Sequence, residues 1–125
     1  MWLISVQGFF SLVCARQGDG GHHQPVDPTR MMLRARCRDH LERLRLRFPA
    51  LLADDEVLES ATADYPFRML LSKATAEQLV VELVRETEWD NFKNKAASIH
   101  GHSSPYLRAL HEVWSVMRRL DPRQP

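Results

Sequence analysis

The 125-residue sequence lacks the motifs that mark the common enzyme and cofactor sites. It contains no Gly-x-Ser-x-Gly nucleophile elbow, no His-Glu-x-x-His zinc motif and no glycine-rich phosphate loop. With no positive sign of catalysis, we expect a non-enzymatic protein without a cofactor, and we assign no catalytic or metal-ligating residue.

Cysteines and long apolar runs are also scarce. Cys14 and Cys37 both lie in stretches where apolar residues alternate, so we expect two small buried hydrophobes. Two cysteines without a repeated spacing do not support a disulfide framework, which favours a reducing, cytoplasmic environment. Residues 1–15 lack the leading positive charge of a secretory signal, and no stretch reaches the roughly 18 apolar residues of a membrane span. We therefore expect no membrane association.

The composition is that of an ordinary globular protein, with 44% apolar and 26% charged residues. The length fits a single domain over residues 1–125. The net charge of +1 hides an asymmetry, because residues 1–53 carry eight arginines, no lysine and four acids. Residues 54–125 carry nine bases against twelve acids. The basic charge of the first half is therefore all arginine.

The stretch 31–38, MMLRARCR, alternates apolar residues with arginines, which is typical of a half-buried strand. Its apolar face holds Leu33, Ala35 and Cys37, and its other face holds Arg34, Arg36 and Arg38. A capping box of Asp39 and Glu42 follows directly and predicts a helix. A strand that leads straight into a helix indicates an α+β domain.

Further patterns predict the remaining elements. Residues 2–7 form a strand with Trp2, Ile4 and Val6 turned inward, and residues 9–15 either extend it after Gly8 or form a second strand. Residues 57–62 and 65–72 form a hairpin, and a capping box at Thr75–Gln78 starts a helix. Residues 89–98 form a short helix, and Ser104-Pro105 starts the last helix. Residues 17–29 form a flexible loop, and residues 121–125 form a tail.

This order predicts a ferredoxin-like α+β fold, in which about three helices back a four-stranded antiparallel sheet. The open face of this sheet is basic. We expect it to carry Leu3, Ser5, Gln7, Arg34, Arg36 and Arg68.

Several segments carry a resemblance to a known group of proteins. They read DPTRMMLRAR, DYPFRMLL, WDNFK and YLRALHEVWSVM. Together they resemble small uncharacterised bacterial and phage-encoded proteins with an LRAR-type strand, a DYxFR hairpin and an NFK segment. The resemblance covers about residues 27–120 and implies no activity.

Two candidate sites stand out. The first would bind nucleic acid through phosphate contacts made by Arg34, Arg36, Arg38, Arg43 and Arg47. The alternative is a solvated surface paired to the acidic half, since no aromatic residue is expected beside Arg34 or Arg36 for stacking with bases.

The second is a pocket for an anionic ligand, lined by Tyr65, Arg68, Asn91, Lys93 and Tyr106. Its alternative is structural: Trp89 and Phe92 anchor the short helix while Asp90 caps it. His22 and His23 are adjacent in the loop, where neighbouring side chains point apart, so we expect no metal site there. For function we expect a binding module that acts through protein contacts, as a homodimer that covers the open sheet face or pairs tryptophan-bearing helices.

Overall fold

In the computed structural model the described residues are 1–123, and the chain divides into two compact units, Met1–Glu88 and Trp89–Pro125. The single domain over residues 1–125 stays a prediction. The last two residues of the predicted 121–125 tail, 124 and 125, lie outside the described residues.

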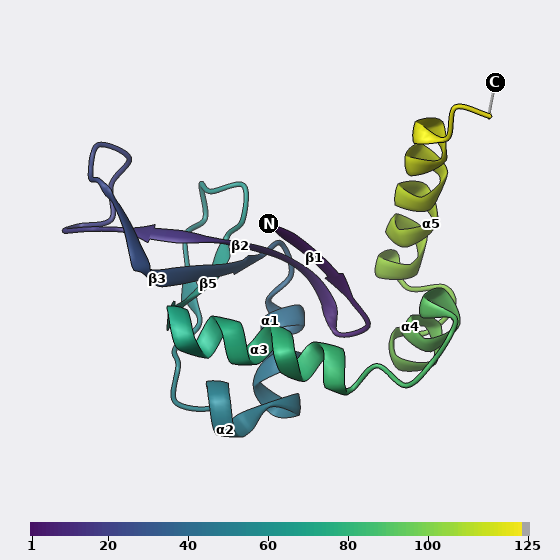
Figure 1. The fold of residues 1–125 in the computed structure, drawn as a ribbon, viewed down its shortest axis with the longest axis horizontal. Helices are drawn as coiled ribbons and strands as arrows, with labels where there is room; N and C mark the ends of the chain where they lie inside the picture. Colours follow the sequence, from purple (N-terminus) through teal and green to yellow (C-terminus); the bar gives the residue numbers. More distant parts are fainter. Residues whose placement is uncertain (124–125) are drawn as a thin grey trace. The chain divides into compact units, whose positions relative to one another are not determined.

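The first unit is built on one antiparallel sheet with the strand order β1-β2-β3-β5-β4. The strands are β1 (Trp2–Ser5), β2 (Gly8–Arg16), β3 (Val26–Ala35), β4 (Leu58–Glu59) and β5 (Phe67–Ser72). The helices α1 (Arg38–Arg47), α2 (Pro49–Leu52) and α3 (Lys73–Arg85) lie on one side of this sheet (Figure 1). The opposite face of the sheet is free of helices of this unit.

The core lies between the sheet and these helices. Strand residues of the core are Phe10, Leu12, Met31, Leu33, Ala35, Met69 and Leu71, and helix residues are Leu41, Leu44, Leu52, Ala76 and Leu79. Each fully buried leucine contributes about 1.5–3 kcal/mol relative to an exposed one, so this layer supplies most of the stability of the unit.

The second unit is helical. It consists of α4 (Phe92–His100), α5 (Pro105–Met117) and the 3₁₀ turn η1 (Arg118–Leu120). Its buried residues are small or aliphatic: Ala96 and Ala97 on α4, and Leu107 and Leu110 on α5. Among the helices of the described residues, none combines the length and the apolar character needed to cross a membrane.

The predicted α+β class is confirmed, but the details differ. Residues 1–123 form five strands and five α-helices rather than four strands and three helices. The ferredoxin-like arrangement is not confirmed, because β1, β2 and β3 are consecutive antiparallel neighbours, without a helix between them. Of the two alternatives for residues 9–15, the second strand is confirmed, since β2 is a separate strand that begins at Gly8.

The predicted faces are reversed within β1, whereas Val6, predicted to point inward, is buried. The turn of Val6 and Gln7 pairs Ser5 with Gly8, and this register places Leu3 opposite the buried Phe10. Leu3 therefore packs against the core, while Trp2 and Ile4 are 70% and 42% exposed. A two-residue turn sets the register of a hairpin, and alternation alone cannot choose which face is buried.

The predicted loop 17–29 is shorter than expected, because residues 26–29 already belong to β3. The remaining turn is closed by the Gln17 N–H, which donates to the Pro25 carbonyl at 2.8 Å. Arg16 adds a second closure, since its Nη1 donates to the Gln24 carbonyl at 2.7 Å.

The predicted caps of α1 and α3 are wrong. Helix α1 begins at Arg38 after Cys37, without a side-chain cap, and Cys37 is exposed because it follows the end of β3. Helix α3 is capped by Ser72, whose Oγ accepts the Thr75 N–H at 3.1 Å. The Ser104-Pro105 start is confirmed, since the Ser104 Oγ accepts the N–H of Leu107 at 3.2 Å.

Gly8 and His40 form a close contact between the sheet and α1. The Phe9 N–H donates to His40 Nδ1 at 3.2 Å, which draws the ring of this buried histidine against the start of β2. A Cβ on Gly8 would lie 2.6 Å from the Cβ of His40 and 2.7 Å from its Nδ1. Only glycine fits there.

We predict that Gly8→Ala lowers the free energy of unfolding by about 1–3 kcal/mol, because the added methyl group forces His40 or α1 to move. Urea denaturation followed by circular dichroism measures this loss. Gly20→Ala is the matched control, since Gly20 also has a positive φ but a Cβ there would meet no atom within 4 Å. Equal losses in the two variants would contradict the steric explanation.

Candidate functional site

A single row of side chains crosses the open face of the sheet. The register pairs Trp2 with Ser11, Ser11 with Arg34, Arg34 with Arg68, and Arg68 with Leu58, so one residue from each of the five strands of the described sheet lies in this row. Arg34 and Arg68 are direct cross-strand partners on the central strands. The predicted outward direction of both arginines is confirmed.

Tyr65 lies at the centre of an arginine cluster on this face. The guanidinium carbon of Arg34 is 4.7 Å from the centroid of the Tyr65 ring, and that of Arg36 is 4.9 Å from it. The expectation that no aromatic residue lies beside these arginines is therefore wrong. The error has a local cause, since Pro66 precedes β5 and Tyr65 does not follow the alternation of that strand.

Two hydrogen bonds hold the cluster in place. Arg34 Nη2 donates to Ser11 Oγ at 2.8 Å, and Arg68 Nη2 donates to the Tyr65 carbonyl at 3.0 Å. The Nε atoms of Arg34 and Arg68 are buried and have no hydrogen-bond partner within residues 1–123. A buried N–H without a partner costs about 1–3 kcal/mol, so the cluster is incomplete by itself. We call Arg34, Arg36, Tyr65 and Arg68 the arginine–tyrosine cluster.

Aromatic side chains continue from the cluster toward β1. The ring of Phe9 is 6.3 Å from that of Tyr65 and 5.7 Å from that of Trp2, which it meets edge-on. Trp2 is the most exposed of the three. A mixed arginine and aromatic surface on an open sheet is suited to phosphate groups and stacked rings.

The cluster brings together residues from both predicted sites: Tyr65 and Arg68 from the ligand pocket, and Arg34 and Arg36 from the nucleic-acid set. The other three arginines of that set lie on α1. Arg38 pairs with Glu42 at 3.7 Å and with Glu59 at 4.0 Å, and Arg47 pairs with Glu86 at 2.8 Å. Arg43 makes no ion pair within residues 1–123.

The remaining residues of the predicted pocket belong to the second unit. The Oδ1 of Asn91 accepts the N–H of Asn94 at 2.9 Å, so Asn91 rather than Asp90 caps α4. Lys93 Nζ lies 4.7 Å from the Trp114 ring, and the Tyr106 ring is 4.9 Å from that of His100. A pocket that combines these residues with Tyr65 and Arg68 stays a prediction.

His22 and His23 lie in the turn between β2 and β3, where His23 lies beside Asp19. His23 Nε2 is 4.0 Å from a carboxylate oxygen of Asp19, and both side chains are well exposed. Within residues 1–123, no group of three or more histidine, cysteine or acidic side chains is placed to hold a metal ion.

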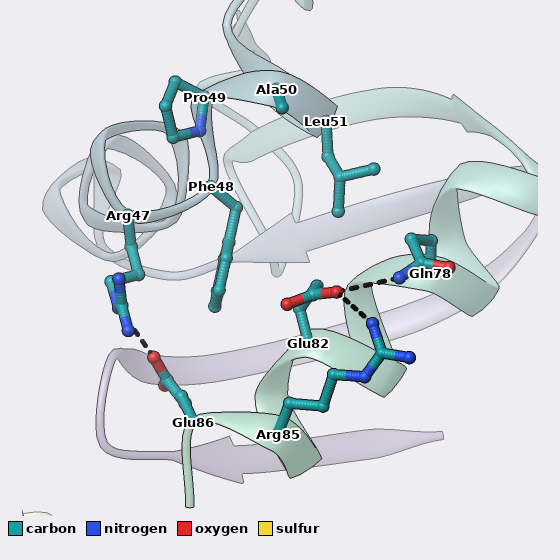
Figure 2. Close-up of a pocket in the computed structure, with 9 residues that line it drawn as sticks. All are labelled: Arg47, Phe48, Pro49, Ala50, Leu51, Gln78, Glu82, Arg85 and Glu86. Carbon is teal, nitrogen blue, oxygen red and sulfur yellow. Dashed lines mark hydrogen bonds and ion pairs between the residues drawn. The ribbon is translucent and has the colours of Figure 1, made fainter.

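A separate groove of about 550 Å³ lies between α1, α2 and α3 (Figure 2). Phe48, Pro49, Ala50 and Leu51 form its apolar lining. Its polar lining is satisfied internally: Arg47 binds Glu86, and Glu82 accepts hydrogen bonds from Gln78 at 2.8 Å and from Arg85 at 3.0 Å. The groove offers no uncompensated charge, unlike the arginine–tyrosine cluster.

Comparisons with known proteins give no assignment, since no family model, curated protein or solved structure matches the chain.

Proposed function

We propose that this chain is a non-enzymatic binding module that acts through protein contacts and forms a homodimer by pairing α5 helices. The observation that carries the proposal is a stripe of exposed apolar side chains on the second half of α5 and on η1. Val113, Trp114, Val116, Met117 and Leu120 are each between 42% and 74% exposed. We call this set the α5 stripe.

The α5 stripe is a continuous surface rather than a scatter of single residues. At 100° per residue, Val113, Met117 and Leu120 lie within one third of the helix circumference, with Trp114 and Val116 on either side. Burial of apolar surface stabilises a contact by about 25 cal/mol per Å². Contiguous exposed apolar patches of this kind mark interaction sites.

A second copy of the chain fits the charges beside the stripe. Glu112 and Arg119 lie on the same flank of the helix, on the side of Val116. An antiparallel pair that sets Trp114 against Met117 of the partner also brings Glu112 opposite Arg119 of the partner, because the two pairings share one two-fold axis. In this pairing the charges beside the α5 stripe are complementary.

Nucleic-acid binding is the second candidate, and it is favoured by the arginine–tyrosine cluster. Six arginines pair with carboxylates: Arg30, Arg38, Arg45, Arg47, Arg85 and Arg123. Arg34, Arg36 and Arg68 form no ion pair within residues 1–123, and the Tyr65 ring lies beside Arg34 and Arg36. This candidate therefore rests on Arg34 and Arg36 of the predicted set, with Arg68 added.

We predict that Met117→Lys weakens dimerisation at least about tenfold, because a charge replaces an apolar group at the centre of the pair. Sedimentation velocity over a range of protein concentrations measures the change. Leu46→Lys is the matched control, since Leu46 is an 83% exposed apolar residue in the last turn of α1.

The flanking charges give a second test of the same pairing. Glu112→Arg should weaken the dimer, and Glu112→Arg combined with Arg119→Glu should restore it. A wild-type chain that is monomeric at all concentrations, or a Met117→Lys variant that dimerises as the wild type does, would contradict the proposal.

For the second candidate, we predict that Arg34→Gln with Arg36→Gln reduces the slope of log affinity against log salt by about 1.8 for duplex DNA, since each lost phosphate contact removes about 0.9. Fluorescence anisotropy with a labelled duplex at several salt concentrations measures this slope. Arg38→Gln with Arg43→Gln removes the same charge from α1 and should leave the slope unchanged. If the wild type binds no DNA or RNA at low salt, this candidate fails.

A further inference from the structure

We infer that Arg34, Arg36 and Arg68 form a binding site for one phosphate group. This site is separate from the α5 stripe and does not depend on dimerisation. It deepens the nucleic-acid candidate only in part, because a free phosphate and the phosphate of a nucleotide present the same oxygens to it.

The first argument is charge. Arg34 and Arg68 are direct cross-strand partners, and like charges directly opposite each other destabilise a sheet. The other described ion pairs of the first unit show that this chain readily places carboxylates beside arginines. On the open face the nearest paired positions are instead Ser11 and Leu58, which carry no charge. Three guanidinium groups therefore share one surface, and none of them forms an ion pair with a carboxylate of residues 1–123.

The second argument is hydrogen bonding. Arg34 Nη2 donates to Ser11 Oγ, and Arg68 Nη2 donates to the Tyr65 carbonyl. The Nε donors of both are buried and have no partner within residues 1–123. A guanidinium group binds an oxyanion through Nε and an Nη in a planar fork. Because both Nε atoms are shielded from solvent, a phosphate would contact these two arginines through Nη1, the donor of each that makes no hydrogen bond within residues 1–123.

The third argument is rigidity. Tyr65 is buried, and the guanidinium groups of Arg34 and Arg36 both stack against its ring. Stacking and the Ser11 bond fix two long side chains before any ligand arrives, which lowers the entropy lost on binding. A carboxylate offers one plane of two oxygens, whereas a phosphate presents oxygens in several directions. Arg34 on β3, Arg36 just after it and Arg68 on β5 therefore suit a phosphate group better than a carboxylate.

The test is NMR of the arginine Nε–Hε groups in the ¹⁵N-labelled full chain. Inorganic phosphate, added at constant ionic strength against sodium chloride, should shift the Nε–Hε signals of Arg34 and Arg68. Arg36→Gln should weaken this binding about tenfold, and Arg36→Lys should weaken it less, because lysine keeps the charge but loses the fork. Arg43→Gln is the control and should bind phosphate as the wild type does.

A second arm identifies the source of the phosphate. Thymidine 5′-monophosphate that binds more tightly than inorganic phosphate, and also shifts the Trp2 indole signal, indicates a nucleotide; equal affinities indicate free phosphate, and both results support the site. No phosphate-dependent shift, or equal shifts in the wild type and Arg36→Gln, overturns it. If oligonucleotides bind while the Arg34 and Arg68 signals stay unmoved, the phosphate site falls, and the oligonucleotides bind a surface other than this cluster. If phosphate binds and oligonucleotides do not, the phosphate site stands and the nucleic-acid candidate falls.

Discussion

The structure of the first unit depends on the double pairing of β3, which hydrogen-bonds to β2 on one side and to β5 on the other. Leu33 and Ala35 are fully buried, so the register of this strand is fixed by its apolar face. A slip of one residue would turn Arg34 into the core and expose Leu33 to water. The position of Arg34 opposite Arg68 is therefore a direct consequence of how the core is packed.

Charged side chains are paired differently on the two faces of the sheet. On the helix side, Glu86 has a side chain only 7% exposed, and it accepts hydrogen bonds from Arg47 at 2.8 Å and from Gln7 at 3.2 Å. This carboxylate ties α1 and the β1–β2 turn to the end of α3. On the open face, Arg34 and Arg36 stack on Tyr65, and the buried Nε donors of Arg34 and Arg68 have no partner within residues 1–123. Local conflicts that a protein retains are expected at functional sites.

The sequence was sufficient where one physical rule acted alone. Strict alternation in MMLRARCR predicted residues 31–35 of β3 with Arg34 on the outer face, although the strand ends at Ala35 rather than at Arg38, and Ser104 with Pro105 predicted the start of α5. Prediction failed where rules competed. Ser72 and Thr75 can both cap a helix, and Ser72 is the cap because β5 ends there. In the same way, the buried face of β1 is set by the two-residue turn and not by the alternation of apolar residues. Tyr65 lies beside the arginines because Pro66 separates it from β5. A periodic pattern in the sequence does not predict this position.

The two proposed surfaces differ in physical origin, and this difference separates them experimentally. The α5 stripe would be buried through the hydrophobic effect, which salts such as sulfate strengthen. The arginine–tyrosine cluster would act through charge, which salt screens over a length of about 10 Å at 0.1 M. Self-association through α5 should therefore persist at ionic strengths that abolish anion binding by Arg34 and Arg36. If self-association and anion binding showed the same dependence on salt, they would have to share one surface that is neither the α5 stripe nor the arginine–tyrosine cluster.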